Sequence, residues 1–270
     1  MTSSTETTRR VRNDLISGFL RWDIWGRLGW QEVKRRYRRT ALGPFWGAIS
    51  IGAFVLVLGS IGSGLFHVLS GNYLPFLAAG MVVWVMLSTM ITEGCSLFID
   101  GGHLYRQMRF DYSILAYALV WRTLIGFAHN FIVYVVCALI ATPSLLLAPT
   151  LPLALFGLAL IAINGVWLAL LLGIFCLRFR DVQQFVTSIL QLALFATPVF
   201  WSPTVFKGGW QLIMVHLNPL YYFIEIVRAP LLGSVPAGKV YLYAIVITLA
   251  GWAMTYWMFR HFRVRIAYWS

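Results

Sequence analysis

A long uncharged stretch limits what this chain can fold into more than any other feature. Residues 40–92 contain no Lys, Arg, Asp or Glu, and five cations within residues 34–39 come immediately before them. A helix needs about 20 apolar residues to cross the hydrocarbon core of a bilayer. The boundary between the basic cluster and the uncharged stretch therefore predicts where the chain enters a membrane, with the basic cluster on the cytoplasmic side.

The composition extends this conclusion to the whole chain. Of its 270 residues, 60% are hydrophobic and 11% are charged, whereas soluble domains carry about 25% charged residues. We therefore predict an all-α polytopic membrane protein. The first apolar run follows a polar, Arg-rich segment without a small-residue cleavage site, so we expect it to remain in the mature chain.

Six transmembrane helices are predicted from the apolar runs, each close to the required length. They fall at about 45–67, 74–98, 113–141, 150–176, 184–202 and 240–259. Residues 203–238 are broken by Pro and Gly into pieces too short to cross, which predicts short re-entrant or gate helices at the periplasmic face. The predicted domains are a cytoplasmic tail with an interface helix (1–43), a transmembrane domain (44–260) and a cytoplasmic tail (261–270).

The distribution of cations tests this topology. If both termini are cytoplasmic, 17 of the 21 Lys and Arg residues lie on that side and 3 on the other, with Arg122 inside the third span. This asymmetry supports six spans with both ends inside. It also argues against nucleic-acid binding, because the cations follow membrane topology and do not gather on one folded face.

The N-terminal segment shows helical periodicity from Asn13 onward, after a Ser/Thr/Arg-rich start (residues 1–12) that we expect to be disordered. Apolar and aromatic residues recur every three or four positions, with charges between them. This pattern favours an amphipathic helix in the membrane interface, and its tryptophans favour that location over a soluble helix packed on a partner. The periodic residues are Leu15, Phe19, Trp22 and Trp25.

Two charges inside apolar spans need an explanation. Glu93 and Arg122 fall at depths where a long Arg side chain can reach the carboxylate if the second and third spans are neighbours. A structural tie is favoured over a substrate contact. The alternative is a proton-coupled secondary transporter in which Glu93, Arg122 and His129 form a relay.

The loop from Asp100 to Asp111 predicts a contact with a soluble partner. It carries apolar residues at helical spacing between charged ends, so it fits a short amphipathic helix that docks into a groove. A solvated connector fits the same residues.

Aromatic residues mark two of the predicted spans. Because aromatic faces stack on sugar rings, such residues suit a path for a carbohydrate chain. Interfacial belts and lipid-facing surfaces are the alternative locations, and the sequence does not choose between them. The candidate channel-lining residues are Phe45, Trp46, Phe54, Phe185, Phe195, Phe200 and Trp201.

The sequence predicts no catalytic or metal site and no cofactor in this chain. Residues 233–239 have the glycine and lysine spacing of a phosphate-binding loop, but Val240 stands where Ser or Thr must hold magnesium. We therefore expect no ATPase of its own. A glycan-processing enzyme is a further alternative, and its candidate carboxylates are Asp100, Asp111 and Asp181.

An ordered set of motifs resembles the membrane subunits of polysaccharide-exporting ABC transporters. The first motif is Arg36-Tyr37-Arg38-Arg39, followed by Leu42-Gly43 and Trp46. Downstream come Arg180-Asp181, Pro198-Val199-Phe200, Asn218-Pro219 and Arg228-Ala229-Pro230. The Gly43-Pro44-Phe45-Trp46 form is most similar to the lipopolysaccharide O-antigen branch, and capsule and teichoic acid exporters are relatives.

The resemblance implies a homodimeric permease in the bacterial inner membrane, paired with two copies of a separate ATPase that binds ATP and magnesium. The substrate implied is an undecaprenyl-diphosphate-linked polysaccharide, moved from cytoplasm to periplasm through a channel lined by spans one and five. The implied coupling residues, which contact the ATPase, are His103, Leu104, Tyr105, Arg106 and Met108. The implied gate residues are Asn218, Pro219, Glu225 and Arg228.

Arginines at the cytoplasmic mouth are the candidates for binding the substrate head group. Arg36, Arg38 and Arg39 carry guanidinium groups that can bind a pyrophosphate bidentately. Their alternative role is positive-inside anchoring of the first span.

Overall fold

The computed structural model describes residues 4–65, 70–101, 111–203 and 209–269, and within these ranges the chain is helical with no strand. The predicted all-α class is therefore confirmed. The helices are α1 (Ser4–Leu20), α2 (Trp22–Tyr37), α3 (Phe45–Leu65), α4 (Ser70–Asp100), α6 (Ser113–Ala141), the 3₁₀ helix η1 (Pro143–Leu147), α7 (Leu151–Arg178), α8 (Val182–Ala196), α9 (Trp210–Leu217), α10 (Pro219–Leu231) and α11 (Gly238–Trp269).

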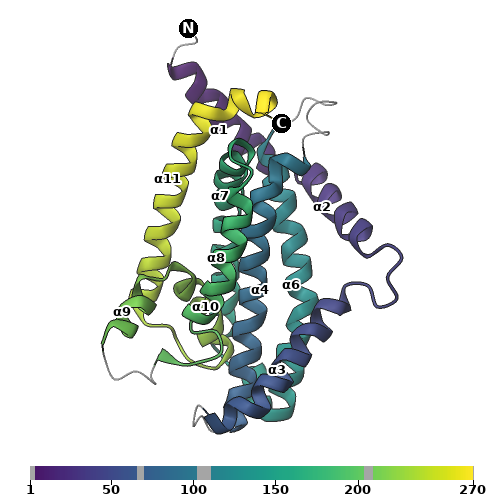
Figure 1. Ribbon diagram of the computed structural model, residues 1–270, viewed down its shortest axis with the longest axis vertical. Helices are drawn as coiled ribbons and strands as arrows, with labels where there is room; N and C mark the ends of the chain where they lie inside the picture. Colours follow the sequence, from purple (N-terminus) through teal and green to yellow (C-terminus); the bar gives the residue numbers. More distant parts are fainter. Residues whose placement is uncertain (1–3, 66–69, 102–110, 204–208, 270) are drawn as a thin grey trace.

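The long helices form a bundle around α4, which packs against α3, α6, α7, α8 and α10. Figure 1 shows both chain termini at the same end of this bundle, while α9 and α10 lie toward the opposite end. The apolar composition of these helices gives a continuous core that includes Leu77, Phe98, Leu119 and Leu170. This arrangement is that of a multi-pass membrane protein.

Four helices in the described residues are long and apolar enough to cross a membrane. They are Tyr73–Asp100, Ser113–Ala141, Leu151–Arg178 and Gly238–Arg263. Two further apolar helices, Phe45–Ile61 and Val182–Ala196, are shorter. The 15 residues of α8 span only about 22 Å at 1.5 Å per residue, so the count of six spans stays a prediction.

Both chain ends are more helical than the sequence indicated. Residues 4–12, expected to be disordered, belong to α1, where Val11 is fully buried and the Thr8 carbonyl accepts from Tyr256 Oη at 3.4 Å. Residues 261–269 continue α11 without a break. In both places packing between α1 and α11 stabilises helix that local composition alone does not specify.

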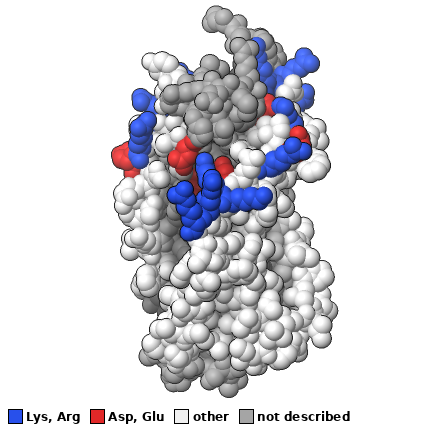
Figure 2. Space-filling model, turned by 90° about the vertical axis from the view of Figure 1, so that its right-hand side faces the viewer, with Lys and Arg blue, Asp and Glu red and all other residues white. Residues whose placement is uncertain are grey.

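Charged side chains are concentrated at the end of the bundle that carries the termini. Figure 2 views the face on the α2 side, where Lys, Arg, Asp and Glu gather from the top down to about mid-height and none is seen over the lower part. This segregation matches a membrane-embedded lower part. That the charged end is cytoplasmic stays a prediction from the cation count.

A fully buried carboxylate connects the two chain ends to the middle of the chain. Asp14 of α1 accepts hydrogen bonds from the backbone N–H of Ser113 at 3.1 Å and of Tyr112 at 3.4 Å. Its Oδ2 also accepts from Arg263 Nε and Nη2 at 2.9 and 2.6 Å. A carboxylate beside the first N–H groups of α6 is favourable, since these groups have no partner within the helix.

Replacing Asp14 by Ala is expected to destabilise the protein by about 2 kcal/mol, because the partly buried Arg263 loses its counter-charge and the start of α6 loses its acceptor. The matched control is Asp23→Ala, where the carboxylate is exposed and the loss should stay below about 1 kcal/mol. Denaturant titration in detergent, followed by circular dichroism, measures both. Equal losses of stability for the two variants contradict the stabilising role assigned to Asp14.

Candidate functional site

Four charged side chains from three helices form one network, here called the charge network: Glu32 and Arg36 of α2, Glu93 of α4 and Arg122 of α6. Arg122 donates to Glu93 Oε2 from both Nε and Nη2 at 2.8 Å, and its Nη1 contacts Glu32. Arg36 Nη2 donates to the other oxygen of Glu93, Oε1, at 2.5 Å. The network therefore balances two cations against two anions.

The structure brings Glu93 and Arg122 together, as their depths in neighbouring helices indicated. Arg122 is 17% exposed and Glu93 is 19% exposed, so each is largely removed from water. Sequence reasoning missed the α2 members. Glu32 and Arg36 are four residues apart and so lie on one helix face, but no local pattern shows that this face meets α4 and α6.

Two cavities lie on either side of the charge network. The inner cavity, of about 200 Å³, lies between α2, α3, α4 and α6, and the outer cavity, of about 730 Å³, lies between α2, α4 and α6. Arg36, Glu93 and Arg122 line both. The charge network is thus the partition between them.

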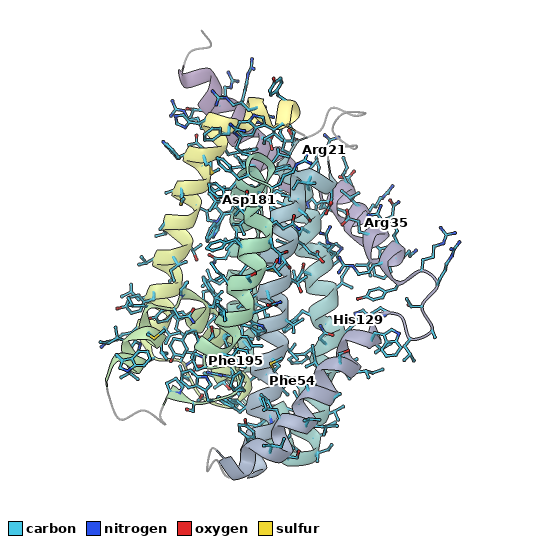
Figure 3. All side chains as sticks on the ribbon, viewed as in Figure 1. Arg21, Arg35, Phe54, His129, Asp181 and Phe195 are labelled. Carbon is cyan, nitrogen blue, oxygen red and sulfur yellow. The ribbon has the colours of Figure 1, made fainter. Side chains whose placement is uncertain are left out.

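His129 of α6 lines the inner cavity, and Figure 3 shows it beside the connection from α2 to α3. Its Nδ1 lies 2.8 Å from the carbonyl of Ile125, one turn earlier, and its ring meets Phe45 edge to face. Nδ1–H donates to the carbonyl in this geometry, which is an ordinary arrangement for a histidine inside a helix bundle.

The three candidate head-group arginines lie in different surroundings. Arg36 belongs to the charge network and is 52% exposed. Arg38 and Arg39 lie on the connection between α2 and α3 and are exposed. Arg39 adopts a positive φ of 73°, which turns the chain between the interface helix and α3.

The candidate channel aromatics are mostly exposed on the surface of the single chain. On α3 these are Phe45, Trp46 and Phe54, and on α8 they are Phe185 and Phe195. Figure 3 shows Phe54 and Phe195 on separate helices of the bundle. Phe200 and Trp201 follow α8 and are partly buried. That the exposed rings face a channel stays a prediction.

The end of α8 carries irregular backbone whose carbonyls are satisfied by side chains. The Pro198 carbonyl accepts from Arg228 Nη1 at 2.5 Å, and the Phe200 carbonyl accepts from Tyr73 Oη at 2.9 Å. Thr197 Oγ1 accepts from Asn218 at 2.7 Å. Non-helical backbone at membrane depth is tolerated only when protein groups satisfy it in this way.

Arg228 of α10 is a deeply buried charge of the predicted gate region, with 2% exposure. Its Nη2 donates to Glu225 at 2.6 Å, and its guanidinium lies 4.3 Å from the centre of the Phe76 ring on α4. Asn218 caps α10 by accepting from Leu220 N at 3.0 Å, and Pro219 occupies the first turn. These contacts fix α10 against α4 and the end of α8.

Two tyrosines of α10 stay uncharged at neutral pH. Burial raises the pKa of Tyr221 and of Tyr222, and the carboxylate of Glu225 raises that of Tyr221 further. Tyr222 Oη donates to the His216 carbonyl at 2.6 Å, so it connects α10 to α9.

The five predicted coupling residues, His103, Leu104, Tyr105, Arg106 and Met108, lie outside the described residues. The residue that follows this segment does have a described contact. Asp111 Oδ2 accepts from Ser17 Oγ of α1 at 2.7 Å, next to the Asp14 contacts. The C-terminal flank of the segment is therefore held by α1.

Together these features define a multi-pass α-helical membrane protein in which the charge network separates two cavities at one end of the bundle. The profile of the ABC-2 type transporter family matches residues 25–232. The protein belongs to the ABC-2 type transporter family, as the ordered motifs predicted.

Curated relatives include proteins named O-antigen export system permease protein RfbA. The one from Myxococcus xanthus is 28% identical over 193 residues, which is 70% of this chain and 73% of the relative. One from Klebsiella pneumoniae is 23% identical over 192 residues, again 70% and 73%. Another from Klebsiella pneumoniae is 22% identical over 232 residues, 83% of this chain and 87% of the relative.

Replacing Arg228 by Met is expected to cost about 3 kcal/mol of stability, because the Glu225 carboxylate and the Pro198 carbonyl lose their donor. The control is Lys239→Met, at an exposed cation, where the change should stay within about 0.5 kcal/mol. Denaturant titration in detergent measures both. A loss at Arg228 no larger than at Lys239 contradicts the role assigned to Arg228.

Proposed function

We propose that this chain is the permease subunit of an ABC transporter that exports an undecaprenyl-diphosphate-linked polysaccharide of O-antigen type from cytoplasm to periplasm. The observation that carries the proposal is the similarity to O-antigen export permeases over 70% or more of the chain. Two copies of the permease enclose the path, and two copies of a separate ATPase bind ATP and magnesium.

The cytoplasmic mouth binds the anionic end of the substrate. Arg36, Arg38 and Arg39 are all exposed at the junction between α2 and α3, and guanidinium groups form strong charge-assisted bonds with phosphate oxygens. The buried Arg122 does not serve this role directly, because Glu93 and Glu32 already occupy its donors.

The glycan follows the exposed faces of α3 and α8. Their aromatic rings offer flat apolar faces to sugar rings. The exposed face of α8 also carries the neutral hydrogen-bonding side chains of Gln184, Ser188 and Gln191, and an unpaired amide is costly against lipid. This polarity supports a water-filled path beside α8 when two copies of the chain associate.

ATP-driven motion reaches the bundle through the segment between α4 and α6. Asp111 bonds Ser17 of α1, and Asp14 of the same helix caps α6 and pairs with Arg263 of α11. A displacement of this segment by an ATPase is therefore transmitted to α1, α6 and α11 together.

Reversing the charge of Arg38 tests whether the cytoplasmic mouth binds the head group of the substrate. Arg38→Glu is expected to reduce export about tenfold or more, since it removes a charged hydrogen bond to phosphate and adds repulsion. The control is Arg27→Glu, an exposed cation of α2 away from the junction. Surface display of the glycan, in cells with matched membrane levels of each variant, measures the effect. Normal export by Arg38→Glu excludes this head-group role.

The source of energy separates this function from proton-coupled transport. Purified chain with its ATPase in proteoliposomes should translocate the lipid-linked glycan when ATP is supplied, and the chain alone should not respond to a proton gradient. The pairing of both oxygens of Glu93 with Arg36 and Arg122 supports this expectation, because it gives the carboxylate a structural role that ties α2, α4 and α6 together. Gradient-driven transport by the isolated chain contradicts the proposal.

A further inference from the structure

An apolar groove lies where the two N-terminal helices cross the bundle, beside the bend at Arg21 between α1 and α2. We call it the elbow groove. Its volume is about 320 Å³, which is within the range of sites that hold a small ligand. Side chains of α1, α2, α6, α7 and α11 line it, and every one of them is apolar or aromatic. Figure 1 shows α1 and α2 at the charged end of the bundle, where both pack against α6.

Aromatic rings held in fixed positions form one wall of the elbow groove. The ring of Tyr117 lies 5.6 Å from that of Phe19 and 6.3 Å from that of Trp25, which in turn lies 6.1 Å from Trp121. Tyr117 Oη donates to the Leu15 carbonyl and Trp25 Nε1 donates to the Phe19 carbonyl, both at 3.1 Å. Because α1 already satisfies these two polar atoms, Tyr117 and Trp25 offer the groove their apolar ring surfaces. The groove is therefore preformed and suits a hydrocarbon chain.

The elbow groove opens on the surface of the chain and reaches down from the charged end. Two of its lining side chains, Phe19 and Ile163, are exposed. Along α6 the lining runs from Tyr117 to Leu124, a rise of about 10 Å, which is about a third of the ~30 Å hydrocarbon core of a bilayer. At that depth an occupant with unsatisfied polar groups is excluded. The chain of a lipid in the adjoining leaflet meets this condition.

Two arginines give the polar end of the elbow groove a positive charge. Arg12 lies seven residues before Phe19, on the same face of α1, and Figure 3 shows Arg21 at the charged end, beside the start of α2. Both are exposed, and neither guanidinium group has an ion pair or hydrogen bond within the described part of the chain. Of the nearby carboxylates, Asp14 is already paired within the bundle and Asp23 is exposed. The excess of positive charge favours a lipid with an anionic head group.

We propose that the elbow groove binds one acyl chain of an anionic phospholipid, whose phosphate is held by Arg12 and Arg21. Guanidinium groups form strong charge-assisted bonds with phosphate oxygens, and the acyl chain buries apolar surface against the aromatic wall. Because the groove is lined by five helices, the bound lipid joins α1 and α2 to α6, α7 and α11. It acts as a structural ligand that stabilises the bend between α1 and α2, and it is separate from the exported substrate.

Native mass spectrometry of the purified full-length chain tests the site. The chain is released from nanodiscs that contain equal amounts of phosphatidylglycerol and phosphatidylcholine with the same acyl chains. Phosphatidylglycerol should stay bound in preference to phosphatidylcholine. Equal retention of the two phospholipids, or retention of neither, overturns the proposal. Undecaprenyl phosphate is added as a competitor, and its displacement of phosphatidylglycerol at equal concentration also overturns the proposal, because the groove would then take the carrier lipid.

Filling the elbow groove with a side chain should replace the lipid. Ala162 of α7 lines the groove, so Ala162→Phe should reduce phosphatidylglycerol retention about tenfold or more. Ala253→Phe adds the same ring at an exposed position of α11 outside the groove and should leave retention unchanged. Phosphatidylglycerol should also raise the Tm of the wild type, since a ligand that binds the folded state stabilises it, and this rise should disappear in Ala162→Phe. Wild-type retention by folded Ala162→Phe overturns the site.

The head-group contact is tested by removing its two charges. The double variant Arg12→Gln, Arg21→Gln should lower the preference for phosphatidylglycerol over phosphatidylcholine about tenfold. The control is Arg27→Gln, an exposed cation of α2 two residues from Trp25 and so on a different helix face, and it should keep the wild-type preference. Both arginines of the double variant are exposed, so this test stands even if Ala162→Phe does not fold. An unchanged preference in the double variant overturns the proposal.

Discussion

Every polar group inside the hydrocarbon region must find its partner within the protein, and the organisation of this molecule follows from that constraint. Arg122 lies deep in α6 and is neutralised by Glu93 of α4 and Glu32 of α2. Satisfying this one guanidinium brings three helices together. Because α2 supplies one of the carboxylates, an ion pair joins the N-terminal helices α1 and α2 to the transmembrane bundle, in addition to their surface packing.

The same constraint acts at both ends of the bundle. At the charged end, Asp14 satisfies the first N–H groups of α6 and pairs with Arg263. At the opposite end, Arg228 and Tyr73 satisfy the carbonyls that follow the short helix α8. These contacts hold the start of α6 and the chain after α8 in place without leaving their polar groups exposed to lipid.

Sequence reasoning was strongest where the signal is local. Apolar runs of sufficient length marked α4, α6, α7 and α11, and the depths of Glu93 and Arg122 in their helices correctly indicated their contact. It was weaker where the packing of one helix against another determines the local structure. Residues 4–12 have no apolar run, yet they form helix because α1 packs against α11.

The sequence by itself determined the membrane class, the long spans, the cation asymmetry and the family, because hydropathy and charge belong to each residue and do not depend on its neighbours in space. Only the tertiary structure decided that Arg36 shares Glu93 with Arg122, that Asp14 reaches Ser113, and that two cavities meet at one partition. The physical reason is sequence distance. These partners lie 29 to 99 residues apart along the chain, and only the packing of the helices determines which of them meet.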